Sequence, residues 1–253
     1  MGEAGGVAQA GWLFATGVVA GVVSVVVSLA SLVSYPALLA IGLPPLTANV
    51  TNTTALVFVG LGSAAGSRDE LGGQGRRLLR LGLLSAVGGA AGAALLLLTP
   101  ASAFEAVVPV LIAAASLVML AGPRLRADSA GARESSSLLN GAVLAVTVYT
   151  GYFGAAGGVL VLAILTALLD ETLVRTIALK NVLNAVANGV AAAAFAAFGP
   201  VDWSAVVPLA VGCLVGGRIG PVVVRRLPAG PLRVVIAVCG LGVAVKLGFD
   251  TYA

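Results

Sequence analysis

The sequence contains no histidine, only two cysteines and few charged side chains, which make up 9% of its 253 residues. Without histidine, a Ser-His-Asp triad, a histidine-ligated metal and an imidazole proton relay are all excluded. Cys213 and Cys239 lie in apolar stretches, so we interpret them as small hydrophobic residues rather than a disulfide or redox pair. No metal or cofactor is therefore expected. Soluble chains are roughly a quarter charged, and the scarcity of charge excludes an ordinary soluble domain.

Apolar residues dominate instead, at 59% of the chain with a mean hydropathy of +1.09. A membrane-spanning helix needs about 20 such residues, so the composition predicts an all-α polytopic membrane protein with seven or eight spans. The net charge of +4 comes mainly from arginines in short clusters, which is typical of cytoplasmic loops and not of nucleic-acid binding. No basic residue precedes the first apolar stretch, so we expect that stretch to be retained rather than cleaved.

The gaps between charges predict eight hydrophobic segments, at about 10–42, 45–66, 78–98, 104–121, 139–168, 174–198, 203–224 and 231–249. The arginine-rich stretches 67–80 and 122–138 are predicted to be cytoplasmic, and 99–103 and 199–202, which lack Lys and Arg, external. A further basic cluster surrounds the connection between the last two segments. If all eight segments crossed the membrane, loop 199–202 would lie on the same side as the arginine-rich stretches 67–80 and 122–138. The basic connection between the last two segments would then lie on the opposite side, against the charge order. The conflict disappears if the first and fifth segments are broken or re-entrant, and both are too long for one straight crossing. We expect the breaks at Pro36 and at Gly151, Gly154, Gly157 and Gly158.

An internal repeat favours the same arrangement. An ungapped alignment of 38–52 with 167–181 places Asn52 on Asn181 and Thr51 on Lys180. In both copies a long apolar segment is followed by a short break and a helix with a polar first turn, and the charge bias of the following loops is reversed. This is the pattern of an inverted duplication. The sequence therefore predicts a single transmembrane domain, 1–253, composed of repeat 1 (10–121), a cytoplasmic linker (122–138) and repeat 2 (139–249).

Glycines at small-xxx-small spacing predict close packing of helices. They are Gly62 with Gly66, Gly88 with Gly92, and Gly212 with Gly216 and Gly220.

Polar residues within the predicted spans cluster at the two equivalent breaks. The first cluster begins with Tyr35 and continues after Pro44 and Pro45, which suit the opening of a helix; the residues after the two prolines are Asn49, Thr51, Asn52, Thr53 and Thr54. The second cluster shares one helical face and consists of Lys180, Asn181, Asn184 and Asn188. Such residues are costly in lipid, so we expect them to face a cavity and bind substrate. Free N–H groups and the helix dipole at the helix starts would favour an anion. The alternative is that these side chains only hold helices together by hydrogen bonds.

Two stretches carry a family resemblance. Residues 31–54, SLVSYPALLAIGLPPLTANVTNTT, resemble the first signature of the sulfite exporter TauE/SafE family, and GYFGAAGGVLVL (151–162) running to ALKN (178–181) resembles the second. The resemblance covers nearly the whole chain. It implies a two-repeat secondary transporter of small anions, typically sulfite, thiosulfate, sulfonates or related organic acids. Family members often carry a glycine-rich run where this chain has residues 30–35, which leaves the anion open.

The charge distribution also bears on mechanism. No Asp or Glu lies within the apolar body of a predicted span, so a carboxylate proton relay has few candidates. A membrane potential negative inside is worth about 2.3 kcal/mol per charge per 100 mV for expelling an anion, which favours export. We therefore expect a multi-pass transporter of the plasma (inner) membrane, and not an enzyme, with the bilayer and a small anion as partners and no nucleic acid. The sequence is also compatible with two alternative functions, an anion channel and a carrier of a different small organic solute. It is compatible with a homo-oligomer as well.

Overall fold

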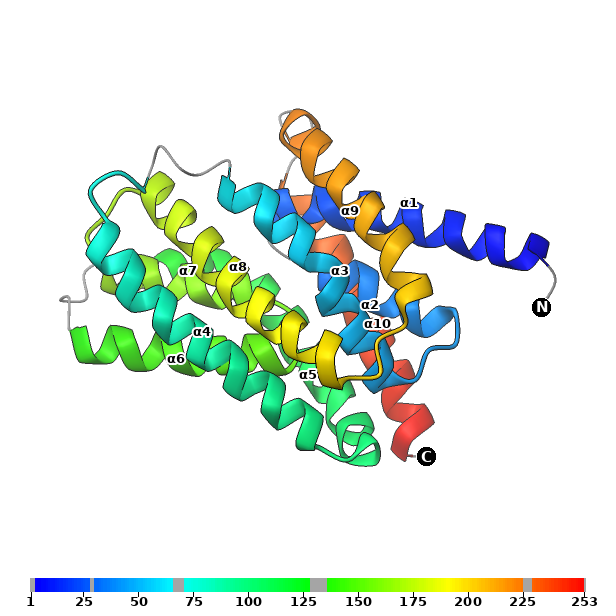
Figure 1. Cartoon of the computed structure of the whole chain (residues 1–253). Helices are drawn as coiled ribbons and strands as arrows, with labels where there is room; N and C mark the ends of the chain where they lie inside the picture. Colours follow the sequence, from blue (N-terminus) through cyan, green and yellow to red (C-terminus); the bar gives the residue numbers. More distant parts are fainter. Residues whose placement is uncertain (1–2, 28–29, 66–70, 128–135, 225–228, 253) are drawn as a thin grey trace.

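The computed structural model describes residues 3–27, 30–65, 71–127, 136–224 and 229–252, and within these ranges it forms ten α-helices and no strand (Figure 1). The predicted all-α architecture is confirmed. The helices are α1 (Glu3–Val27), α2 (Ser31–Ala40), α3 (Pro45–Ala65), α4 (Gly75–Leu98), α5 (Ala101–Ala127), α6 (Ser136–Tyr152), α7 (Gly157–Leu168), α8 (Leu173–Phe198), α9 (Trp203–Val224) and α10 (Ala229–Tyr252).

The helices differ widely in length and composition. Within the described residues, five stretches are long and apolar enough to cross a bilayer: Gly6–Ser24, Gly75–Leu98, Ala101–Val118, Val174–Phe198 and Val234–Tyr252. In contrast, α2 and α7 have 10 and 12 residues, or about 15 and 18 Å at 1.5 Å per residue, against a hydrocarbon core of about 30 Å. Many large apolar side chains point outward, as a surface in contact with lipid requires. These are the properties of a polytopic membrane protein.

The two longest predicted segments each contain two helices. Residues 139–168 cover most of α6 and all of α7, and the chain between them turns at Gly154, with φ of +76°, and Ala156, with φ of +60°. Residues 10–42 cover most of α1 and all of α2, but the prediction that Pro36 breaks this segment is wrong. Pro36 lies inside α2, and the helix boundary falls before Ser31. A proline removes a single backbone hydrogen bond from a helix, and the rest of α2 continues past it. The predicted boundary between the segments 10–42 and 45–66 does separate α2 from α3, and the chain turns there at Gly42, with φ of +89°.

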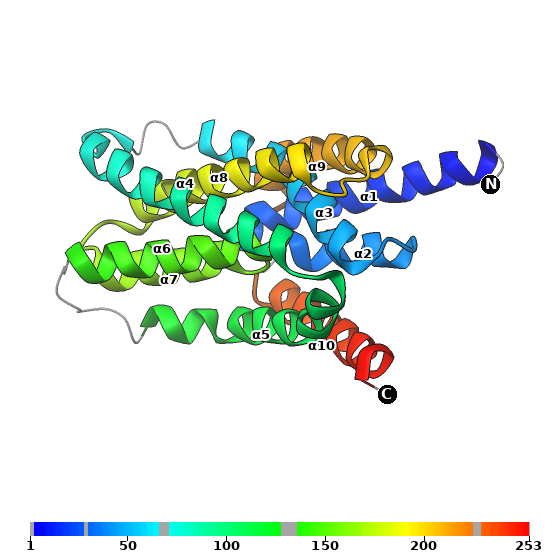
Figure 2. The same ribbon diagram turned by 60° about the horizontal axis from the view of Figure 1, so that its bottom comes forward.

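Two pairs of helices pack closely on opposite sides of the central helices α3 and α8 (Figures 1 and 2). One pair is α1 with α9, and the other is α4 with α6. A Cβ added at Gly216 of α9 would collide with the carbonyl oxygen of Val18, and one at Gly92 of α4 with that of Val148. The predicted close packing is confirmed for these glycines and for Gly88 and Gly212, whereas the predictions for Gly62, Gly66 and Gly220 lie outside the described side chains.

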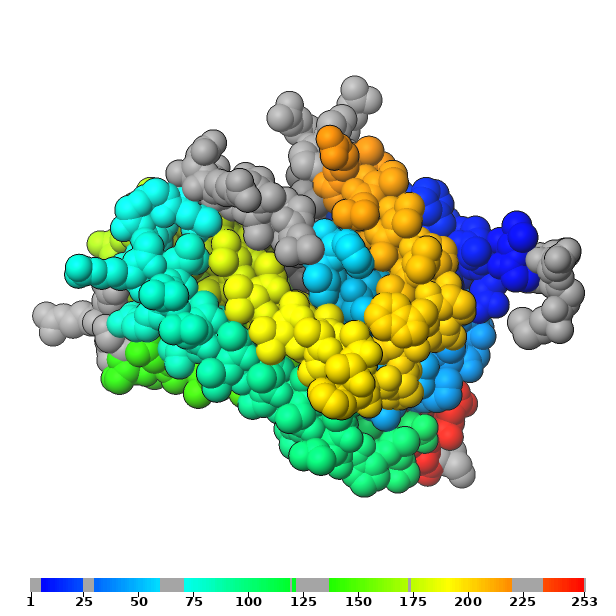
Figure 3. All heavy atoms as spheres, in the orientation of Figure 1, coloured from blue at the N-terminus to red at the C-terminus, as the bar shows by residue number. Residues whose placement is uncertain are grey.

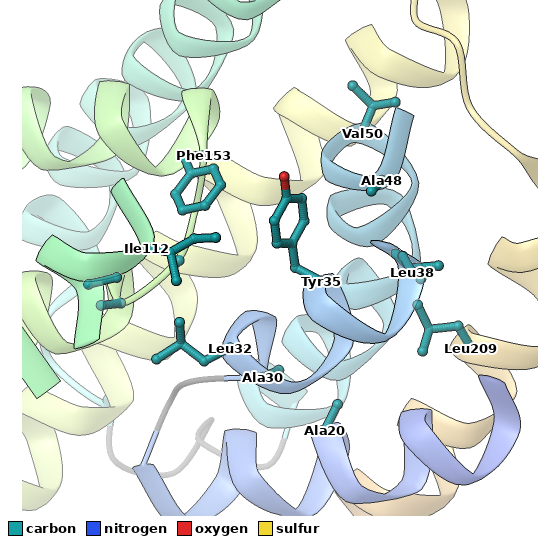
Figure 4. Close-up of a cluster of buried hydrophobic side chains, with 14 of the residues drawn as sticks. Ala20, Ala30, Leu32, Tyr35, Leu38, Ala48, Val50, Ile112, Phe153 and Leu209 are labelled. Carbon is teal, nitrogen blue, oxygen red and sulfur yellow. The ribbon is translucent and has the colours of Figure 1, made fainter. Parts of the chain in front are cut away.

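Buried apolar residues form two clusters around α3 and α8. The larger includes Tyr35, Leu38 and Leu209, part of which Figure 4 shows. The smaller joins α4, α6, α7 and α8, and it includes Leu81, Leu139, Leu168 and Leu179. Helices α3 and α8 also contact each other directly, and the face where they lie next to α4 and α9 is visible in Figure 3. The two helices that carry most of the predicted site residues, α3 and α8, are therefore packed directly against each other.

Candidate functional site

A cavity of about 280 Å³ lies between α3 and α8, at the point where α2 and α7 begin. It combines hydroxyl, amide and ammonium groups with a set of apolar side chains, and no carboxylate is among its described lining residues. These are Ser24, Ala30, Ser31, Thr53, Leu56, Val59, Thr150, Gly154, Gly158, Ile177, Lys180, Asn181, Asn184, Ala185 and Asn188.

Helix α8 supplies the polar wall. The structure brings all four predicted residues of this helix, Lys180, Asn181, Asn184 and Asn188, to the cavity. Lys180 is only 6% exposed. Asn188 Nδ2 donates a hydrogen bond to the backbone oxygen of Asn184 (3.0 Å), while the buried Oδ1 of Asn184 accepts none from the described residues. The wall thus carries one formal positive charge and three amides on successive turns of one helix.

The starts of two short helices also reach the cavity. Gly154 and Gly158 come from the start of α7, and Ala30 and Ser31 from the start of α2. Neither start has a side chain that caps its backbone N–H groups. The first turn of a helix leaves N–H groups without intrahelical partners, and the helix dipole makes that end positive. Both short helices therefore present N–H groups and partial positive charge on the side of the cavity.

Most of the predicted residues on α3 have other contacts. Thr53 lines the cavity, but Asn49, Thr51 and Asn52 do not. Asn49 Nδ2 donates to the carbonyl oxygen of Tyr152 (2.9 Å), and its Oδ1 is buried without a partner among the described residues. Thr51 Oγ1 accepts from the backbone N–H of Asp202 (3.0 Å), and Asn52 Oδ1 accepts from the hydroxyl of Ser34. These three side chains hold α3 against α2, the end of α6 and the connection from α8 to α9.

Tyr35 lies in the larger apolar cluster rather than on the cavity. Its ring meets Phe153 edge-on, with centroids 5.6 Å apart, as Figure 4 shows. Phe153 in turn contacts Phe104. The hydroxyl of Tyr35 lies 3.4 Å from the carbonyl oxygen of Pro45, a long contact. Tyr35 therefore packs the start of α3 against the break between α6 and α7.

Three hydroxyl residues of the cavity were not predicted. Ser24, Ser31 and Thr150 all lie near the ends of helices at the two breaks, within otherwise apolar stretches. Thr150 Oγ1 bonds the carbonyl oxygen of Val146 in its own helix (2.8 Å). A single Ser or Thr in an apolar helix commonly makes such a bond, so only its position beside a break could have marked it.

An ionic cluster lies near the start of α4 and the connection from α7 to α8. Glu171 accepts hydrogen bonds from Arg77 Nη1 (2.7 Å) and Arg175 Nη1 (3.1 Å), and Arg175 Nη2 also donates to the carbonyl oxygen of Gly72 (2.5 Å). The hydrogen bond from Arg77, followed by the charges of both arginines, lowers the pKa of Glu171. The cluster fixes the start of α8, and with it the helix that carries Lys180.

Comparison with known proteins gives a consistent result over nearly the whole chain. The family model described as sulfite exporter TauE/SafE matches residues 13–247. The chain is 25% identical over 246 residues to "Probable membrane transporter protein ORF9" of Sinorhizobium sp, covering 94% of this chain and 92% of the relative. It is 25% identical over 240 residues to a "Probable membrane transporter protein" of Haemophilus influenzae, covering 94% of each. For "Probable membrane transporter protein YfcA" of Escherichia coli the identity is 26% over 249 residues, covering 96% and 90%. No solved structure matches significantly.

Proposed function

The chain belongs to the sulfite exporter TauE/SafE family, a family of membrane transporters, and on that premise we propose that it is a secondary transporter that exports small anions. The anions are of the class of sulfite, sulfonates or related organic acids, and they bind in the cavity between α3 and α8. The membrane is the plasma (inner) membrane.

The observation that carries this proposal is the chemistry of the cavity. Lys180 is buried on its wall, three amides follow on the same helix, and the uncapped starts of α2 and α7 add N–H donors. All these groups stabilise negative charge, and hydrogen bonds to an ionised group are the stronger kind. We assign substrate contact to Thr53, Lys180, Asn181, Asn184 and Asn188. Tyr35, Asn49, Thr51 and Asn52 are assigned the role of holding α2 and α3 in place.

We further propose that α1–α5 and α6–α10 are inverted repeats, with the cavity between them. Exchange of the two sets converts each major helix contact either into another major contact or, for α3 with α8 and α5 with α10, into itself. The contact of α1 with α9 becomes that of α6 with α4, α3 with α9 becomes α8 with α4, and α2 with α10 becomes α7 with α5. An inverted repeat with substrate bound at the repeat interface is a recurrent transporter architecture.

The position of the α6–α7 hairpin supports a re-entrant segment. Leu139 near the start of α6 and Leu168 at the end of α7 belong to the same cluster as Leu81 near the start of α4. The stretch 67–80 before and within the start of α4 is arginine-rich, which favours the cytoplasmic side. At the other ends of the long helices, a Cβ added at Gly199 would meet the side chain of Leu97. In this topology α6 and α7 enter and leave on the cytoplasmic side.

The proposal is tested with purified protein in proteoliposomes and by thermal shift against sulfite, sulfate, thiosulfate, sulfonates and short carboxylates. Lys180→Gln should abolish both the thermal shift and saturable efflux, because it removes the charge but keeps much of the side-chain volume. The matched control is Lys246→Gln, since Lys246 is the other lysine of the chain and lies exposed on α10. Asn52→Ala should weaken the thermal shift and the efflux indirectly, because it removes the acceptor for the hydroxyl of Ser34 and so loosens α2 against α3.

Two results would overturn the proposal. An unchanged shift in Lys180→Gln would remove the cavity as the binding site. Flux that does not saturate and shows no counter-flow stimulation would indicate an anion channel instead. Export driven by potential further requires that an imposed potential, negative on the side containing substrate, accelerates efflux at fixed pH.

A further inference from the structure

We propose that the cavity binds organic anions that carry a hydroxyl group, and that Thr150, Asn184 and Asn188 recognise this hydroxyl as hydrogen-bond acceptors. This inference rests on the proposed function and narrows its substrate class to sulfonates and carboxylates with a hydroxyl group. It follows from the orientation of the oxygen atoms in the part of the cavity where α6 ends beside α8.

Asn184 on α8 supplies a buried acceptor. The residue lines the cavity, and its Oδ1 receives no hydrogen bond from the described part of the chain. A buried carbonyl oxygen without a partner leaves the cost of its desolvation uncompensated. A ligand that donates a hydrogen bond at this place removes that cost, whereas an apolar group or an anionic oxygen does not.

Asn188, one turn further along α8, is oriented by its own hydrogen bond. Its Nδ2 donates to the backbone oxygen of Asn184 (3.0 Å), which fixes the amide group and distinguishes its oxygen from its nitrogen. The Oδ1 approaches the turn that follows α6, where a Cβ added at Gly154 would lie 3.7 Å from it. Asn188 and Gly154 both line the cavity. Asn188 therefore presents a second acceptor beside the end of α6.

Thr150, in the last turn of α6, adds two oxygens. Its hydroxyl hydrogen is used in the bond to the carbonyl oxygen of Val146 (2.8 Å), so Oγ1 can only accept from a ligand. The backbone oxygen of Thr150 lies 3.2 Å from the same added Cβ at Gly154. In a continuing α-helix this oxygen would accept from the N–H of Gly154, but that N–H bonds the oxygen of Tyr149 instead (3.3 Å). The last carbonyl oxygens of a helix also carry the negative end of its dipole.

The remaining polar groups of the cavity are compatible with such a ligand. The hydroxyls of Ser24, Ser31 and Thr53 can donate or accept, and the starts of α2 and α7 supply N–H groups that suit an acid group. Lys180, assigned above to substrate contact, precedes Asn184 by one helical turn, or about 6 Å along α8. An acid group and a hydroxyl joined by a short carbon chain match this spacing.

A hydroxyl group agrees better with the proposed export than an ammonium group does. Both groups donate hydrogen bonds, but an anion with an added ammonium group is a zwitterion without net charge. A membrane potential cannot drive its efflux, whereas a hydroxylated anion keeps its full charge.

The first test compares anions of the same shape that differ only in a terminal hydroxyl or methyl group. The pairs are 2-hydroxyethanesulfonate with propanesulfonate, and glycolate with propionate. Calorimetric titration of the purified protein in detergent should show at least about tenfold tighter binding of each hydroxylated compound, because a methyl group leaves the acceptors unpaired. In a cavity without such acceptors the methyl compound would bind more tightly, so the order of the two affinities is diagnostic.

Variants assign the preference to individual acceptors. Asn184→Leu should reduce the ratio of the dissociation constants within a pair by about tenfold, and Thr150→Val by about threefold. Thr150→Ser keeps an acceptor and should retain the original ratio. A purely structural role would weaken both members of a pair and leave their ratio unchanged.

The matched control is Thr166→Val on α7. Thr166 Oγ1 makes the same kind of bond within its own helix, to the carbonyl oxygen of Leu162 (2.7 Å), but Thr166 is not among the described residues that line the cavity. The ratio should therefore stay as it is in the unmodified protein. A change as large as that in Thr150→Val would overturn the role of Thr150.

The outcomes distinguish this inference from the proposed function. If the members of each pair bind equally well, or if neither pair binds while sulfite does, the inference is overturned and anion transport stands. Replacement of sodium by potassium in the buffer should have no effect. If the methyl compounds bind only in sodium, the acceptors hold a cation and the inference is likewise overturned. If neither pair nor sulfite binds, the proposed function fails and this inference fails with it.

Discussion

Helices α3 and α8 are equivalent members of the two repeats that we propose, but their polar residues have different contacts. Lys180 and Asn181 of α8 face the cavity, whereas the aligned Thr51 and Asn52 of α3 accept hydrogen bonds from Asp202 and Ser34. The cavity therefore has one polar helix and one mainly apolar helix. In the two proposed repeats, equivalent helices thus carry polar residues with different roles. The predictions below test this contrast, from the largest effect to the smallest.

The packing of the two halves should be equally sensitive to added volume. Gly92→Val and Gly216→Val both force a side chain into backbone of the neighbouring helix, and each should destabilise the protein by at least about 3 kcal/mol. Gly82→Val and Gly217→Val are the controls on the same two helices, because a Cβ there meets nothing within 4 Å. Thermal unfolding and monodispersity in detergent measure the effect. A tolerant Gly92→Val beside a disruptive Gly216→Val would show that the two pairs are not equivalent.

Removal of one amide from each central helix should have opposite consequences. Asn184→Leu removes a cavity group whose Oδ1 has no described partner, so it should weaken anion binding about tenfold and leave stability nearly unchanged. Asn49→Leu removes the hydrogen bond to Tyr152, so it should cost about 1–2 kcal/mol of stability and affect affinity less. Calorimetric titration and thermal unfolding of both variants check this. The distinction between the helices fails if both variants lose affinity to the same extent.

The contrast also shows what could be predicted from the sequence. Hydropathy and charge order were sufficient for the helical membrane architecture, and glycine spacing predicted the close contact at Gly92 and Gly216, because both patterns depend on local sequence. The polar face of α8 follows from helical periodicity alone, and all four of its residues reach the cavity. The separate roles of Asn49 and Thr51 could not be predicted, because Tyr152 and Asp202 are distant in sequence. Pro36 was misleading since a helix can continue past one proline.

The two helix breaks differ in backbone conformation, which predicts opposite effects of glycine. Ala156 precedes α7 with φ of +60°, where an alanine is strained, whereas Ala30 precedes α2 with φ of −50° in the ordinary helical region. Ala156→Gly should therefore raise stability by up to about 1 kcal/mol, and Ala30→Gly should lower it by about 0.5–1 kcal/mol. Thermal unfolding of the two variants measures the difference. The same sign in both would contradict the assigned left-handed conformation at Ala156.

The smallest expected effect concerns the ionic cluster that fixes the start of α8. Glu171→Gln should cost up to about 1 kcal/mol near neutral pH, since the three side chains are partly exposed and such pairs contribute little. Because the pKa of Glu171 is lowered in the folded state, its contribution is present above the ordinary glutamate pKa and is lost as the pH falls through the lowered one. The difference between the two proteins should therefore disappear in acid. Asp170→Asn is the control, because Asp170 is exposed and no ion pair involves it among the described residues. A difference that persists unchanged in acid would mean that Glu171 acts through packing and not through its charge.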